Sequence, residues 1–150
     1  MRFRSVLVMV SLLCLTACNV LPGWLVDAKS VLKGQISGSG MSKDTKLAVV
    51  FGLPDPSEFS QAEVIAVASD GSFSYPIPAG QENLTAFAFQ DTNANSRVDA
   101  AEPNSFEVSK CRNCSYIQAT LDRDVWKVLI REAGATLQVD IANAAIRFNG

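Results

Sequence analysis

The sequence contains no histidine, two tryptophans and two tyrosines. Without histidine, the Ser-His-Asp and Cys-His arrangements of nucleophilic catalysis are excluded. A glycine-rich loop that could hold a phosphate group is absent as well. Paired carboxylates could serve a glycoside hydrolase, but the acidic residues are concentrated in one loop or lie singly in turns. We therefore predict that the protein is not an enzyme.

The sequence also lacks an apolar run of the roughly 20 residues that a membrane-spanning helix needs. The apolar run at residues 6–15 is shorter, follows Arg2 and Arg4, and precedes small residues. This pattern is typical of a secretory signal. The letters LTAC at residues 15–18 resemble the lipobox of bacterial lipoproteins. The resemblance implies a signal peptide at residues 1–17 and acyl chains such as palmitate on Cys18; the alternative is an ordinary signal peptide.

Acyl chains on Cys18 would anchor the mature protein to a membrane, because each buried methylene contributes about 0.8 kcal/mol. Residues 18–30 would then form a lipidated tether. Asn19 follows the cysteine, at the place where an aspartate often retains lipoproteins in the inner membrane. We therefore expect an exported protein, lipid-anchored to the bacterial cell envelope, with the outer membrane favoured over the inner membrane.

Positive charge is scarce once the leader is removed. Residues 18–150 carry 11 basic and 15 acidic residues, for a net charge of −4. Nucleic-acid binding depends on a basic patch, so we do not expect nucleic acid as a partner. The remaining length suits one domain, which we place at residues 31–150.

Two cysteines remain in the mature chain, Cys111 and Cys114, in the order CRNC. In an exported protein such a pair is typical of a short disulfide. A redox-active pair is the alternative, although it is usually found at the start of a helix in a βαβ unit. A zinc site would need two further ligands, which a chain without histidine does not offer.

Short apolar runs separated by turn residues fill the rest of the chain. They predict an all-β fold, an immunoglobulin-like or prealbumin-like β-sandwich of about seven to nine strands. The expected strands are residues 31–38, 45–53, 62–69, 72–78, 83–90, 105–109, 115–121, 125–131 and 135–141. We expect a loop at residues 53–61 and a tight hairpin at Asp70 and Gly71. Residues 133–148 are ambiguous between strand and helix.

The side-chain pattern also predicts which residues share a face of a strand. Phe73, Tyr75 and Ile77 alternate with polar or proline positions and should share one face. The same alternation groups Trp126 with Val128 and Ile130, and Leu137 with Val139 and Ile141. Residues 83–90 are apolar on both faces, as expected for a central strand.

A family resemblance agrees with this fold. KGQISG at residues 33–38, the turn DGSF at 70–73 and PAG at 78–80 precede an apolar strand. This order is similar to the carboxypeptidase-regulatory-like and transthyretin-like sandwich domains of bacterial surface proteins. The resemblance extends from Lys33 to about Val108. It implies a sandwich that acts as a non-catalytic module.

One loop carries the pattern of a metal site. Residues 91–102 match the calcium pattern D-x-[DN]-x-[DN]-G-x₅-E at positions 1, 3, 5, 9 and 12. The matching residues are Asp91, Asn93, Asn95, Asp99 and Glu102. The main-chain carbonyl of Arg97 would add a ligand at position 7, and Val98 corresponds to the apolar anchor at position 8. Because Ca²⁺ prefers six to eight oxygen ligands, we predict a calcium site here that resembles an EF-hand loop.

The loop departs from the calcium pattern in two ways. Ser96 occupies the sixth position, where glycine normally allows the sharp turn with φ > 0. Strands, rather than the helices of an EF-hand, are expected on either side of the loop. The second departure favours a structural calcium site over a sensor, because no helix pair is present to open. The alternative is an ordinary polar loop that binds no metal.

A binding module is the main competing function. Sandwich domains present loops and edges, to which a polysaccharide or an envelope protein could bind. Trp24, Tyr75, Tyr116 and Trp126 could stack on sugars if they are exposed, although we expect Trp126 to be buried. Exposed coplanar aromatic rings would favour carbohydrate binding, and a bare sheet edge would favour a protein partner.

Overall fold

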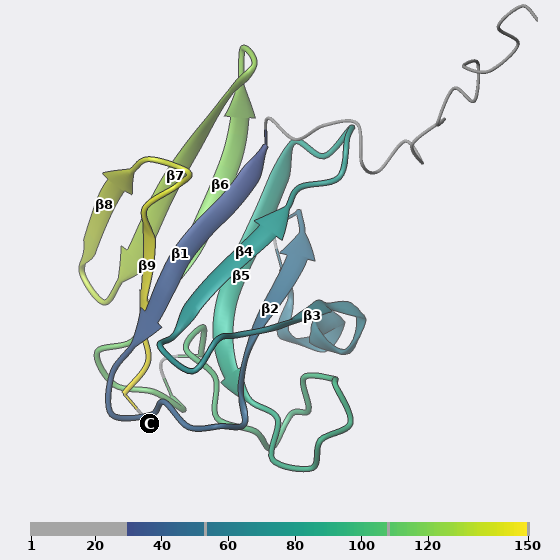
Figure 1. Ribbon diagram of the computed structural model, residues 1–150, viewed down its shortest axis with the longest axis vertical. Coiled ribbons are helices and arrows are strands. Elements are labelled where there is room, and N and C mark those ends of the chain that lie inside the picture. The colour runs from purple at the N-terminus through teal and green to yellow at the C-terminus, as the bar shows by residue number, and fades with distance from the viewer. Residues whose placement is uncertain (1–29, 53, 108, 150) are drawn as a thin grey trace, which may run out of the picture.

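The computed structural model describes residues 30–52, 54–107 and 109–149, and this part of the chain folds into nine strands and one 3₁₀-helix (Figure 1). The elements are β1 Val31–Ser37, β2 Thr45–Phe51, η2 Pro56–Gln61, β3 Glu63–Ala66, β4 Ser72–Pro76, β5 Asn83–Gln90, β6 Ser115–Asp122, β7 Val125–Glu132, β8 Ala135–Val139 and β9 Ala144–Arg147. The predicted signal peptide, the lipidation site Cys18 and Trp24 lie outside the described residues. Within those residues, no helix is both long and apolar enough to cross a membrane.

The strands form two sheets, so the predicted all-β sandwich is confirmed. The larger sheet has six strands in the order β3-β2-β5-β6-β7-β8, and the smaller one has three in the order β4-β1-β9. Figure 1 shows the small sheet lying over the large one. Neighbouring strands are antiparallel except β1 and β9, which pair in parallel with Gly34 opposite Ala144.

Two apolar cores follow from the alternation of side chains along the strands. The inner core lies between the sheets and includes Leu32, Leu47 and Ile117. The outer core lies on the opposite face of the large sheet and consists of Ala48, Val50, Phe59, Phe87, Phe89 and Val98. Strand β5 lies between β2 and β6 and contributes to both cores, which confirms the prediction of a central strand.

The segment predicted as a loop at residues 53–61 contains the helix η2. Asp55 caps this helix by accepting a hydrogen bond of 2.9 Å from the Ser57 amide, and Pro56 occupies its first turn. Both are recognised signals for a helix start, and the prediction overlooked them. The helix places Phe59 in the outer core, where the side chain is buried.

The turn at Asp70 and Gly71 is tight, but it does not form the predicted hairpin. Strand β3 pairs with β2 in the large sheet, whereas β4 pairs with β1 in the small sheet. The turn therefore carries the chain from one sheet to the other. Gly71 has φ of +87°, and a Cβ there would lie 2.1 Å from the Ile36 carbonyl oxygen. Local turn residues predict the change of direction but not the partner strands.

The predicted strand at residues 105–109 is absent from the described part of that segment. Only an isolated bridge between Phe89 and Asn104 forms there. The Ser105 side chain accepts a hydrogen bond of 2.9 Å from the Ala88 amide, in the place where a further strand would bond. Residues 109–110 and 112–113 then form turns, so no ladder of paired residues forms with β5.

The ambiguous C-terminal stretch, residues 133–148, contains the strands β8 and β9 and no helix. The predicted face of Leu137, Val139 and Ile141 is only partly covered, because Leu137 is 62 % exposed. Strand β8 is the last strand of the large sheet, and the small sheet ends at β9. Trp126, which we expected to be buried, is half-buried against the inner core. Phe73, Tyr75 and Ile77 share a buried face as predicted.

Candidate metal centre

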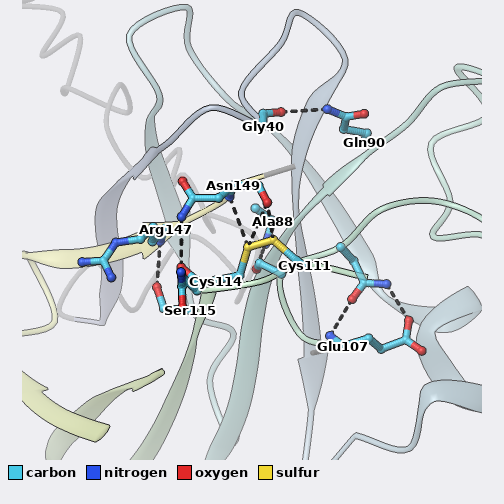
Figure 2. The surroundings of a disulfide bond; sticks show 12 residues. Gly40, Ala88, Gln90, Glu107, Cys111, Cys114, Ser115, Arg147 and Asn149 are labelled. Carbon is cyan, nitrogen blue, oxygen red and sulfur yellow. Dashed lines mark hydrogen bonds between the residues drawn. A yellow bond between two sulfur atoms is a disulfide. The ribbon is translucent and has the colours of Figure 1, made fainter. Parts of the chain in front are cut away.

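The acidic loop, residues 91–102, follows β5 at the end of the sandwich where β1 finishes and β2 begins. The Asp91 amide donates to the Asp44 carbonyl at 2.9 Å, and the Gln90 amide donates to the Pro103 carbonyl at 3.0 Å. The Gln90 side chain also donates to the Gly40 carbonyl at 2.7 Å (Figure 2). The bond between Gln90 and Pro103 joins the two ends of the loop, and the other two bonds attach its start to the connection between β1 and β2.

The first and last predicted ligands, Asp91 and Glu102, are each 4 % exposed. The two carboxylate oxygens of Asp91 accept hydrogen bonds from the amides of Asn95 and Ser96, at 3.0 and 3.1 Å. Glu102 Oε1 accepts from the Thr92 amide at 2.8 Å. Asp91 thus binds the main chain in the middle of the loop, and Glu102 binds it near the start, so both carboxylates fold the loop back on itself.

The middle ligands converge on Asp99. The side-chain amides of Asn93 and Asn95 both donate to Asp99 Oδ2, at 2.7 and 2.8 Å. The Asp99 amide in turn donates to Glu102 Oε2 at 3.2 Å. The hydrogen bonds from Asn93 and Asn95, together with the charge of Arg97, lower the pKa of Asp99. One connected network therefore joins the five predicted side-chain ligands.

The backbone of the loop turns sharply at two residues that are not glycine. Ala94 and Ser96 both have φ of +57°, in the left-handed region that favours glycine. Ser96 thus adopts the turn that the calcium pattern requires at its sixth position. The Arg97 amide donates to Asn95 Oδ1 at 2.8 Å, while its carbonyl stays a predicted ligand.

Val98 ties the loop to the body of the domain. Its side chain is 4 % exposed and belongs to the outer core with Phe59 and Phe87. The polar half of the loop faces solvent, whereas Val98 occupies a core position. This arrangement agrees with the anchor predicted at the eighth position of the pattern.

Carboxylates alone do not make a metal site in the described part of the chain. No three His, Cys, Asp or Glu side chains there are grouped so that they could hold an ion by themselves. A cation in the acidic loop would need the amide oxygens of Asn93 and Asn95 and a main-chain carbonyl as well. Calcium accepts such a mixed set of oxygen ligands.

The predicted disulfide between Cys111 and Cys114 is present (Figure 2). The two residues are 4 % and 8 % exposed, and they lie in the turn that precedes β6. Cys114 Sγ accepts a hydrogen bond of 3.1 Å from the Asn149 amide. Next to it, Ser115 Oγ accepts from the Arg147 amide at 2.7 Å. The disulfide therefore lies where β6 and the end of β9 meet.

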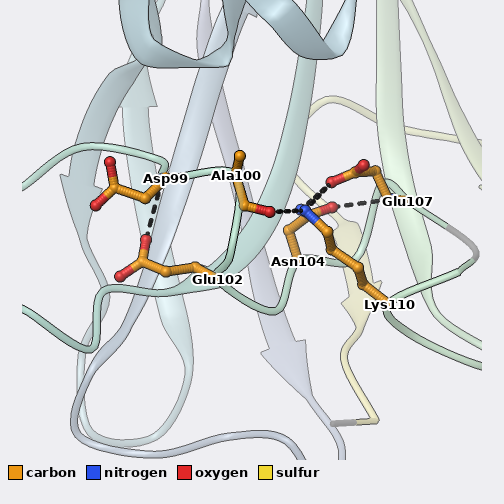
Figure 3. Close-up of polar contacts among 6 residues, drawn as sticks. All are labelled: Asp99, Ala100, Glu102, Asn104, Glu107 and Lys110. Atoms are coloured by element: carbon orange, nitrogen blue, oxygen red, sulfur yellow. Dashed lines mark hydrogen bonds and ion pairs between the residues drawn. The ribbon is translucent and has the colours of Figure 1, made fainter.

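Sequence reasoning missed a second polar cluster, which lies directly after the acidic loop (Figure 3). Lys110 forms an ion pair of 2.6 Å with Glu107 and donates to the Ala100 carbonyl at 2.5 Å. The Asn104 side chain is buried and donates to Glu107 at 2.6 Å. Burial would raise the pKa of Glu107, but hydrogen bonds from Lys110 and Asn104 and the charge of Lys110 lower it. Asn104, Glu107 and Lys110 are spaced three residues apart. The sequence predicts a strand at residues 105–109, in which side chains three positions apart point to opposite faces, so it gives no reason to expect this cluster.

The aromatic residues considered for sugar stacking have different environments. Tyr75 is buried in the inner core and donates to Glu63 Oε2 at 2.7 Å. Burial, followed by this hydrogen bond, raises the pKa of Tyr75. Tyr116 is half-buried and packs on Phe106, with ring centroids 4.6 Å apart. Because Tyr75 is buried and Tyr116 packs against a neighbouring ring, neither is a freely exposed stacking surface.

Comparison with protein-family models, with curated proteins and with solved structures found no match. The resemblances to the lipobox, to the surface sandwich domains and to the calcium loop therefore stay predictions.

Proposed function

We propose that the protein is a lipid-anchored lipoprotein of the bacterial cell envelope, and that its sandwich is a non-catalytic module stabilised by one calcium ion. The calcium site is supported by one observation above all, the burial of Asp91 and Glu102 at the two ends of one loop. Among the described residues, neither carboxylate takes part in an ion pair. Buried carboxylates without a counter-charge are costly, and a bound divalent cation would supply that charge.

The ligand set suits calcium in particular. Asp91, Asn93, Asn95, Asp99 and Glu102 would provide side-chain oxygens, and the Arg97 carbonyl would complete the set. Magnesium demands a stricter octahedral geometry and gives up its waters reluctantly. We expect the weak affinity of extracellular calcium modules, with Kd of about 10⁻⁴ to 10⁻³ M.

The role proposed for the ion is structural. An ion bound to the acidic loop would hold together a connection whose anchor, Val98, packs in the outer core. At ten times Kd, calcium would stabilise the domain by about 1.4 kcal/mol. This is a useful part of the total stability of about 5–15 kcal/mol that is common for domains.

Thermal unfolding of residues 19–150 tests the calcium proposal. At ten times Kd, calcium should raise the melting temperature by about 5 °C relative to EGTA, and magnesium should raise it less. The substitution Glu102→Gln keeps the shape of the side chain but removes a buried charge, so it should abolish most of the calcium-dependent shift. Glu82→Gln, at an exposed position outside the loop, is the matched control. An equal calcium-dependent shift in the unchanged protein, Glu102→Gln and Glu82→Gln, or no shift with any ion, would disprove the calcium site.

Cell fractionation tests the lipid anchor. The unchanged chain should be recovered with membranes, and Cys18→Ser should move it to the soluble or the uncleaved pool, because the cysteine sulfur is the predicted point of acylation. The Cys111→Ser variant, which keeps Cys18, is the control. If Cys18→Ser leaves both membrane association and processing unchanged, the lipidation proposal is wrong. A polysaccharide or an envelope protein as partner stays a prediction of the sequence.

A further inference from the structure

The acidic loop and the disulfide are physically connected. We define the cysteine loop as residues 104–114, which leads from the acidic loop to β6. Lys110 lies directly before Cys111, and its ammonium group reaches back to the acidic loop. There it donates to the Ala100 carbonyl at 2.5 Å, two residues before the buried Glu102 (Figure 3). This contact crosses from one loop to the other.

The base of the cysteine loop is held by a compact set of hydrogen bonds. The Glu107 carbonyl accepts from the amides of Lys110 and Cys111, at 2.9 and 3.2 Å. Asn104 is fully buried and makes two hydrogen bonds with Glu107. Its side chain donates to the Glu107 carboxylate and accepts from the Glu107 amide at 2.9 Å. Because Asn104 lies two residues after Glu102, this set of bonds begins where the acidic loop ends.

The other end of the cysteine loop is held by the disulfide. Cys111 and Cys114 have Cα atoms 5.6 Å apart, and Cys114 Sγ accepts from the Asn149 amide. The cross-link removes conformations of the turn between the two cysteines. It thereby constrains Cys111, the residue to which Lys110 is directly joined. Because Glu107 neutralises Lys110, this contact brings no net positive charge toward a bound cation.

We propose that the Cys111–Cys114 disulfide and the calcium site are thermodynamically coupled, with Lys110 as the positioning residue between them. This inference rests on the proposed calcium site. The oxidised protein binds calcium more tightly than the reduced protein, because the disulfide keeps the Ala100–Glu102 end of the acidic loop in its binding geometry. Linkage is reciprocal, so calcium makes the disulfide harder to reduce by the same factor.

The redox step needs a dithiol reductant. One of its thiolates attacks a sulfur of the disulfide to form a mixed disulfide, and its second thiol then displaces the protein sulfur. Two electrons and two protons are transferred in total. Cys111 and Cys114 become thiols, and the dithiol becomes a cyclic disulfide.

Calorimetric titration of residues 19–150 with Ca²⁺ tests the coupling. This fragment contains the nine strands and both cores of the described residues, and its only cysteines are Cys111 and Cys114. Reduction with dithiothreitol should raise Kd for calcium about fivefold or more. In dithiothreitol redox buffers, saturating calcium should shift the equilibrium constant for reduction by the same factor. The Cys111→Ser, Cys114→Ser double variant should bind calcium like the reduced protein.

Lys110→Met tests the positioning role in the oxidised protein. It should weaken calcium binding and remove the difference in Kd between the oxidised and reduced forms, which a purely structural role would not do. Lys127→Met, which removes an ion pair with Asp122 elsewhere, should leave the difference unchanged. Equal Kd values in the oxidised, reduced and Lys110→Met proteins would overturn the coupling and leave the calcium site intact. Absence of calcium binding in every form would overturn both proposals. If the reduced protein unfolds, the comparison of oxidised Lys110→Met with oxidised Lys127→Met decides the positioning role, and equal Kd values in these two variants would overturn it.

Discussion

Replacing Phe87 with alanine should lower the free energy of unfolding by about 3–5 kcal/mol. Phe87 is fully buried at the centre of the outer core, where its ring lies 4.7 Å from that of Phe59 and 5.8 Å from that of Phe106, measured between centroids. The substitution loses the free energy gained by transferring the ring from water to the core. It also leaves a cavity that the neighbouring strands can fill only partly. Urea denaturation, followed by circular dichroism, measures the loss.

The same substitution should affect the acidic loop. Val98 shares the outer core with Phe87, so the cavity would loosen the anchor of the loop and weaken the proposed calcium binding as well. Phe106→Ala is the control, because Phe106 is half-buried at the rim and its loss should cost less. If the two variants are equally stable, the outer core does not have the packing described above.

Replacing Gly34 with alanine should cost about 3 kcal/mol or more, at the upper end of the range for overpacking. Gly34 lies in the middle of β1, paired on one side with Phe73 and on the other with Ala144. A Cβ at this position would lie 1.7 Å from the Ala144 carbonyl oxygen and 2.7 Å from the ring of Phe73. The carbonyl belongs to the backbone, so β1 and β9 would have to separate to admit the methyl group.

Hydrogen exchange measures this effect strand by strand. Amides of β9 should lose protection in Gly34→Ala before those of β6, because β9 pairs only with β1 among the described strands. Lys33→Ala changes the exposed neighbour on the same strand and is the control. Its free energy of unfolding should stay within about 0.5 kcal/mol of that of the unchanged protein. If Gly34→Ala changes neither the midpoint of urea denaturation nor the exchange pattern, the close approach of β1 and β9 is contradicted.

The features that the sequence predicts well are those set by nearby residues. Alternation alone places Phe73, Tyr75 and Ile77 on one buried face, because successive side chains in a strand point to opposite sides. The spacing of the acidic loop likewise identifies Asp91 and Glu102, and the structure brings them into one hydrogen-bonded network. Both patterns are contained in a stretch of about a dozen residues or fewer.

The features that the sequence does not reveal depend on residues far apart in the chain. Asp70 and Gly71 predict a turn, but the pairing of β3 with β2 and of β4 with β1 is decided by the packing of the two sheets. Lys110 has no motif of its own, and its contact with Ala100 exists only because two loops meet. Leu137 alternates like a core residue, yet β8 extends beyond the cover of the small sheet.

The parallel pairing of β1 with β9 has a mechanical consequence. The described chain enters this pair at Ser30 and leaves it at Asn149, at the opposite end of the two strands (Figure 1). A force applied between those points would slide the strands along their common axis. Their evenly spaced hydrogen bonds would share that load together instead of opening one after another. A domain tethered through the residues before β1 and pulled at its far end would thus be loaded in shear, the direction in which paired strands resist separation best.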